Sequence, residues 1–139
     1  MKISAVLLVF FGLSNMLYAQ SQLEIVVKNI KNDKGNVRVG IFNNKETFLE
    51  KALYGKVVQA STGELTVLFE NIPPGKYAVS IIHDENKNDE LDSGMFGIPK
   101  EGFGFANDAM GSFGPPGFEK ASITVETGKR TITITLRYL

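Results

Sequence analysis

The residues from Thr131 to Tyr138 alternate strictly between polar and apolar side chains, and this period of two constrains the fold more than any other feature. Ile132, Ile134, Leu136 and Tyr138 point one way, while three threonines and an arginine point the other. Successive side chains of an extended chain leave on opposite faces, so this pattern is typical of a half-buried strand. We therefore expect a β-strand here with one face on a core.

The same alternation recurs earlier in the chain, between segments that favour tight turns. Four further strands are expected over residues 23–27, 37–42, 65–69 and 77–81, with turns at 32–35 and 72–75. About seven short strands in one domain-sized chain predict an all-β protein. We expect a single antiparallel β-sandwich of immunoglobulin-like or prealbumin-like type over residues 20–139.

One segment departs from the period of two. Between residues 44 and 54, Phe48 lies four positions before Ala52, and Leu49 four before Leu53. That spacing places each pair on one face of a helix. Asn44 is a suitable N-cap. The sequence therefore predicts a short helix that crosses one end of the sandwich.

The first nineteen residues have the pattern of a secretory signal peptide. Lys2 supplies a positive start, residues 3–13 form an almost unbroken apolar run, and Ala19 ends a segment of small and polar residues. The apolar run is too short to favour the alternative of a membrane anchor. We expect cleavage after Ala19, no transmembrane segment in the mature chain, and a periplasmic or secreted location.

Composition narrows the chemistry of the mature chain. It has no cysteine, so its stability must come from an apolar core, with or without a metal ion, and thiol chemistry is excluded. Its charge is nearly balanced, and no run of basic residues occurs. Nucleic acid is therefore not an expected partner.

Residues 84–92 form an acidic stretch with oxygen-bearing side chains at alternate positions. Five of its nine residues are Asp or Glu and one is Lys. Calcium accepts six to eight oxygen ligands in flexible geometry, which suits such a loop. The expected ligands are the side chains of Asp84, Asn86, Asn88 and Asp92 and the carbonyl oxygen of Glu90, with Glu101 or Asp108 as additional donors.

The loop differs from an EF-hand, because its twelfth position is Met95 rather than a bidentate Glu. The alternative interpretation is a solvated turn in which Asp and Asn side chains bond to the local backbone. If calcium binds, its role would be to order the long segment that follows.

That segment, residues 84–117, lacks any clear strand or helix pattern. Seven of the chain's fourteen glycines lie between residues 94 and 117, together with Phe96, Phe103, Phe105 and Phe113. Disordered linkers are poor in aromatic residues, so we expect an ordered loop. The phenylalanines either form a small core under the loop or are exposed as a contact patch, at which the 94–117 loop would bind an unknown protein or small ligand.

Three stretches of the chain resemble a bacterial exported family catalogued as domain of unknown function 2141. They read His83-Asp84-Glu85-Asn86, then Gly97-Ile98-Pro99-Lys100-Glu101-Gly102-Phe103-Gly104-Phe105, then Phe113-Gly114-Pro115-Pro116-Gly117-Phe118. The resemblance covers nearly all of the mature chain. It implies an exported protein and assigns no activity.

A more distant resemblance concerns the stretch Asn71-Ile72-Pro73-Pro74-Gly75-Lys76-Tyr77-Ala78-Val79. It is similar to a turn and strand of carboxypeptidase-regulatory-like and collagen-binding B-type sandwiches, which are prealbumin-like. In such extracellular sandwiches, a D-x-N-x-N-G-x-x-D loop commonly binds calcium. Asp89 stands here in the position of the glycine. Asp tolerates a left-handed backbone better than most residues, which keeps the loop geometry available.

Three functional hypotheses follow from these features. The leading one is a non-enzymatic exported module whose loop, ordered by calcium, presents a binding surface, with no catalytic residues. The first alternative is a hydrolase-like enzyme that uses His83 with Glu101 or Asp92. The lone His83 is more often a hydrogen-bonded structural residue than a base. The second alternative is a structural subunit of a cell-surface assembly, which predicts an exposed edge strand.

Overall fold

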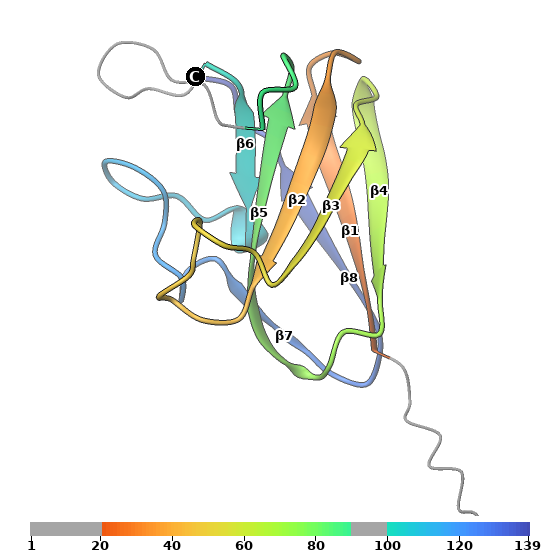
Figure 1. Cartoon of the computed structure of the whole chain (residues 1–139), viewed down its shortest axis with the longest axis vertical. Helices are drawn as coiled ribbons and strands as arrows, with labels where there is room; N and C mark the ends of the chain where they lie inside the picture. The colour runs from red at the N-terminus through yellow and green to blue at the C-terminus, as the bar shows by residue number, and fades with distance from the viewer. Residues whose placement is uncertain (1–20, 90–99) are drawn as a thin grey trace, which may run out of the picture.

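The computed structural model describes residues 21–89 and 100–139, which form two β-sheets packed face to face (Figure 1). The strands are β1 (Ser21–Ile30), β2 (Asn36–Phe42), β3 (Tyr54–Gln59), β4 (Gly63–Glu70), β5 (Gly75–Asp84), β6 (Gly102–Phe105), β7 (Ser122–Val125) and β8 (Gly128–Thr135). A short 3-10 helix, η2 (Ala106–Asp108), follows β6. No described helix is long and apolar enough to span a bilayer. The expected signal peptide lies outside the described residues.

The strands divide into a three-stranded and a five-stranded sheet. The first has the order β4-β1-β8, and the second has the order β3-β2-β5-β6, with β7 pairing with the lower part of β5. The all-β, two-sheet prediction is confirmed, with eight described strands rather than about seven. Among the described ladders, β1 and β8 form the one parallel pair, in which Ile25 faces Ile132. The expectation of a wholly antiparallel sandwich is wrong here, because a period of two fixes faces and says nothing about strand direction.

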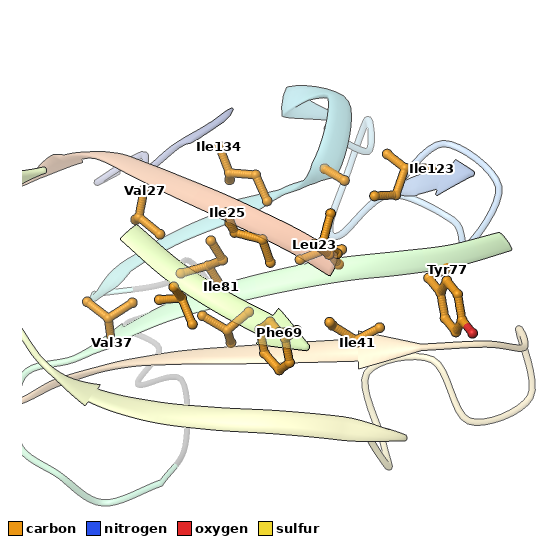
Figure 2. Packing of buried hydrophobic residues seen from close by; sticks show 14 of the residues in the cluster. Leu23, Ile25, Val27, Val37, Ile41, Phe69, Tyr77, Ile81, Ile123 and Ile134 are labelled. Atoms are coloured by element: carbon orange, nitrogen blue, oxygen red, sulfur yellow. The ribbon is translucent and has the colours of Figure 1, made fainter. Parts of the chain in front are cut away.

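The main core lies between the two sheets. In β1, Leu23, Ile25 and Val27 are fully buried while the residues between them are partly exposed, as the alternation predicts. They meet Ile41, Ile81 and Ile134 from β2, β5 and β8 (Figure 2). Each such side chain contributes about 1.5–3 kcal/mol on burial. The core therefore accounts for a stable domain without disulfides.

The chain beyond β8 closes one edge of the sandwich. The Leu136 N–H donates to the Lys28 carbonyl at 2.9 Å, which extends the pairing with β1. One residue later, Arg137 and Phe103 exchange two backbone hydrogen bonds of 2.9 and 3.1 Å. The C-terminal segment therefore passes from the three-stranded sheet to the five-stranded sheet and covers the free edge of β6.

Strand β6 lies in the segment that the sequence predicts to be a loop, so that prediction is wrong for residues 102–105. Its apolar residues alternate with glycines rather than polar residues, and all four are buried. A Cβ on Gly102 would lie 2.5 Å from the Tyr138 ring, and one on Gly104 would lie 2.8 Å from Ile134 Cγ2. The glycines are thus required by the close approach of the C-terminal segment, and they remove the usual strand pattern.

The predicted helix over residues 44–54 is absent, and the segment forms turns instead. Asn44 does cap a turn, since its Oδ1 accepts a hydrogen bond of 3.0 Å from the Thr47 N–H. Leu49 then has a φ of 65°, which a continuing right-handed helix does not allow. Packing of the Phe48 ring edge-on to Phe42, with centroids 5.3 Å apart, overrides the helical pattern.

A second, smaller core covers the outer face of the five-stranded sheet. Its buried members are Phe42, Ala78, Phe103, Phe105 and Ala121. The segments 43–53 and 106–121 fold over it from the same end of the sheet (Figure 1). Phe103 and Phe105 thus form the small core that the sequence offers as one alternative. Phe113 is instead fully exposed, which corresponds to the second alternative.

Candidate functional site

The acidic loop begins with a buried carboxylate at the end of β5. Asp84 is fully buried, and its Oδ2 accepts a hydrogen bond of 2.8 Å from the Asp89 N–H. Its Oδ1 accepts a longer bond of 3.2 Å from the Asn88 N–H, which also lies 3.2 Å from Asn86 Oδ1. These bonds satisfy both oxygens of the buried carboxylate. The chain is therefore wrapped around Asp84, with Asn86 and Asn88 beside it.

The backbone of this loop has two left-handed residues, Lys87 with φ 57° and Asp89 with φ 66°. Asp89 therefore adopts a left-handed conformation, which glycine favours and Asp tolerates. Its carboxylate also forms an ion pair with Arg38 of β2, at 2.6 Å between Oδ1 and Nη1. The pair is partly exposed and ties the loop to the outer face of the five-stranded sheet.

The structure brings some of the predicted ligands together and separates others. The register of β5 and β6 pairs His83 with Gly102, so Asp84 and the buried Glu101 are the next residues along the two strands. Asp108 lies beyond the opposite end of β6, and its Oδ1 accepts a bond of 3.0 Å from the Thr135 N–H. Glu90 and Asp92 lie outside the described residues. Within residues 21–89 and 100–139, no three acidic or histidine side chains are grouped closely enough to hold a metal ion.

His83 points to the opposite face of the sheet and into the main core. It is fully buried, with Nε2 at 2.7 Å from the Lys34 carbonyl and Nδ1 at 2.8 Å from the Tyr138 hydroxyl. A carbonyl can only accept, so Nε2 carries the proton and Tyr138 donates to Nδ1. The Tyr138 oxygen accepts in turn from the Lys31 N–H at 3.0 Å. His83 is thus a hydrogen-bonded structural residue, and this geometry lends no support to the hydrolase alternative.

Tyr138 titrates differently from an exposed tyrosine. Burial raises the pKa of its hydroxyl, the N–H of Lys31 lowers it in part, and the negative charge of Glu85 raises it further. Glu85 is placed there by a hydrogen bond of 2.6 Å from the Asn32 amide of the β1–β2 turn. The turn, the start of the acidic loop and the C-terminal segment are therefore connected at one end of the sandwich.

A broad groove of about 1240 Å³ lies on the outer face of the five-stranded sheet. Its floor includes Gly40 of β2, Gly55 of β3 and Ser80 of β5, which the strand registers place in one row across the sheet. Leu49 lines it from the turn segment, and Met110 from the loop after β6. Three charged side chains reach it from the outer face of the sheet and the neighbouring loops: Arg38, Glu50 and Asp89. The groove is thus mainly apolar, with few charged side chains.

Exposed apolar side chains are concentrated on this groove. Among the described residues, five large hydrophobic side chains are exposed, and four of them line it: Leu49, Val57, Phe113 and Leu139. Scattered exposed apolar residues are ordinary, whereas a cluster around one concavity marks an interaction surface. The groove, together with the adjoining acidic loop, is therefore the candidate site.

Residues 25–133 match the model of a family described as "Uncharacterized protein conserved in bacteria (DUF2141)". The chain belongs to this family. The DUF2141 match runs from β1 to β8 and includes the acidic loop, β6 and the groove lining apart from Leu139. No curated protein and no solved structure matches the chain significantly.

The DUF2141 groove could be predicted only in part. Of the two alternatives for the phenylalanines of the 94–117 loop, Phe113 fits exposure. Leu49 and Val57 are not identifiable from the sequence, because one belongs to a segment with a helical pattern and the other to a strand with no clear alternation. Gly40 and Gly55 are the features of the sequence that could indicate the groove, since glycines inside strands often mark a place where a ligand or another backbone approaches closely.

Proposed function

We propose that this DUF2141 chain is an exported, non-enzymatic binding module of the immunoglobulin-like or prealbumin-like type. An apolar partner occupies the groove, and a calcium ion held by residues 84–92 fixes the neighbouring loop. The observation that carries the proposal is the concentration of exposed Leu49, Val57, Phe113 and Leu139 on one groove. Covering them would remove a large apolar area from water.

The backbone at the groove supports this role. Leu49 has φ 65° and is 42% exposed, so a strained backbone is combined with only partial burial of an apolar side chain. Such strain in a non-glycine residue is found where a surface is shaped for a ligand. The small number of charged side chains in the groove favours an uncharged contact surface.

The acidic loop supports the calcium part of the proposal. Asp84 is already oriented by two backbone N–H groups, as a ligand at the first position of such a loop must be. Asp84, Asn86 and Asn88 would supply side-chain oxygens, and Glu90 and Asp92 the remainder, with Glu101 adjacent. Calcium would neutralise the clustered carboxylates and hold the loop against the sheet.

Photo-crosslinking tests the groove. The protein is produced in cells with the photo-crosslinking residue benzoylphenylalanine in place of Phe113 of the mature chain, residues 20–139. A control protein carries the same residue in place of Thr133, on the outer face of the three-stranded sheet. We expect the probe at position 113 to give one discrete crosslinked product with a partner. The probe at position 133 should not give this product, and neither should the probe at position 113 when Leu49→Ser is also present. Equal labelling at both positions would overturn the binding role.

Calcium titration by calorimetry, with melting temperature as a second readout, tests the metal. We expect heat of binding and a higher melting temperature at millimolar calcium for the mature protein, both lost in Asp84→Ala. The matched control is Asp33→Ala, which removes an exposed carboxylate from the β1–β2 turn and should leave both signals unchanged. Absence of heat and of thermal stabilisation in the unaltered protein would rule out the calcium site.

A further inference from the structure

Strand β3 is an edge of the five-stranded sheet with one side open. Its only described ladder is with β2, and the Ala60 N–H donates to the Gly35 carbonyl at 3.1 Å just beyond it. Hydrogen bonds of an antiparallel pair recur at every second residue, so Tyr54, Lys56 and Val58 bond to β2. The backbone N–H and C=O groups of Gly55, Val57 and Gln59 therefore point outward, away from β2.

This edge is continuous with the groove. Gly55 and Val57 both line the groove, and the Val57 side chain is 52% exposed. The other described edges differ. The β6 edge is closed by Arg137, and the edge strands β4, β7 and β8 carry no exposed large apolar side chain. An open edge and an apolar surface thus coincide at β3 alone among these strands.

Lys56 gives the edge a charge preference. Its side chain leaves the opposite face of β3, lies over the Phe69 ring at 5.1 Å, and donates to the Leu68 carbonyl. An inward-pointing lysine on an edge strand discourages pairing with a second copy of the same edge. An incoming strand with an acidic side chain beside Lys56 would instead be favoured, because opposite charges on neighbouring strands attract.

We propose that β3 receives an extended segment of a partner protein as an added strand. Alternate apolar side chains of the segment lie toward the groove beside Val57, and an intervening acidic side chain lies beside Lys56. Main-chain hydrogen bonds to Gly55, Val57 and Gln59 supply affinity. The alternate apolar side chains and the acidic side chain of the segment supply selectivity. This inference rests on the proposed function and names its partner class.

Fluorescence polarisation with synthetic octapeptides tests the backbone contact. The peptides have apolar residues at alternate positions and a glutamate at a central intervening position. In the mature protein, Val57→Pro removes the central outward N–H without removing a bond to β2, and Val57→Thr is the matched control that keeps this N–H. We expect Val57→Pro to weaken binding about tenfold or more and Val57→Thr to weaken it far less. Circular dichroism checks that both variants are folded.

Exchanging charges tests the role of Lys56. We expect the unaltered protein to bind the glutamate peptides about fivefold more tightly than otherwise identical lysine peptides, and Lys56→Glu to reverse this order. Strand addition is wrong if no octapeptide binds, or if Val57→Pro binds as well as Val57→Thr. If either of these two results is found together with a specific crosslink at position 113, the groove still binds a partner and only strand addition at β3 is rejected.

Discussion

His83 and Tyr138 lie 55 positions apart in the sequence, yet a hydrogen bond of 2.8 Å joins Nδ1 of one to the hydroxyl of the other. The bond connects the end of β5 to the C-terminal segment, inside the same end of the sandwich that carries the acidic loop. Lys31 and Lys34 of the β1–β2 turn complete the chain of bonds through their backbone groups. Three separate segments are therefore held together by one buried polar network.

Removing the tyrosine hydroxyl should destabilise this end. Tyr138→Phe leaves His83 Nδ1 buried without its donor, so we expect the free energy of unfolding to fall by about 1–3 kcal/mol. Urea denaturation measures the loss. His83→Leu in the same background is the control, because replacing both partners should cost less than the sum of the two single changes. Strictly additive losses would show that the bond contributes nothing.

Alkaline pH should destabilise the protein through the same tyrosine. Burial raises the pKa of Tyr138, and also that of Tyr77, above the value in the unfolded chain. The unfolded state therefore loses these protons first, and the free energy of unfolding falls as pH rises above about 10. Urea unfolding between about pH 9 and pH 11 measures the slope, which should be smaller in Tyr138→Phe. An identical slope in that variant would contradict the assignment.

The two aspartates of the acidic loop should differ in their effect on stability. Asp84→Asn places an amide NH₂ against one of two backbone donors in a buried site, so we expect a loss of about 1–3 kcal/mol in the absence of calcium. Asp89→Asn breaks only a partly exposed ion pair with Arg38 and should cost less than about 1 kcal/mol. Thermal unfolding in a chelating buffer compares them. Equal losses would be inconsistent with the buried role of Asp84.

The glycines of β6 should not tolerate a methyl group. Gly104→Ala would place a Cβ 2.8 Å from Ile134 Cγ2, so we expect a loss of about 1–3 kcal/mol from overpacking. Gly117→Ala is the matched control, since nothing lies within 4 Å of its Cβ position. Chemical denaturation of both variants gives the difference. Similar stabilities would mean that the C-terminal segment can shift away from β6.

The parts of the fold that could be predicted from the sequence are those in which local pattern and tertiary environment agree. Residues 131–138 alternate because one face meets the core and the other meets water, and that strand is confirmed. β6 could not be predicted, because Gly102 and Gly104 are dictated by side chains that lie thirty or more positions later in the chain. The segment around Leu49 has a helical spacing that the packing of Phe48 overrides.

The candidate site also has a part that could be predicted from the sequence and a part that could not. Asp84, Asn86 and Asn88 could be identified from their spacing, because an oxygen at every second residue is a local property. The groove is assembled from β2, β3, β5, β6, the loops beside them and Leu139, and its exposed residues have no common spacing. Only the register of the sheet brings Gly40, Gly55 and Ser80 into one row.

The parallel pairing of β1 with β8 determines when the domain can fold. The first and last described strands are neighbours, so β1 has only β4 beside it until β8 has been synthesised. The C-terminal residues that follow then close the edge of β6. Contacts between distant positions form slowly, so the three-stranded sheet is completed only after β8 has been synthesised and has returned to β1.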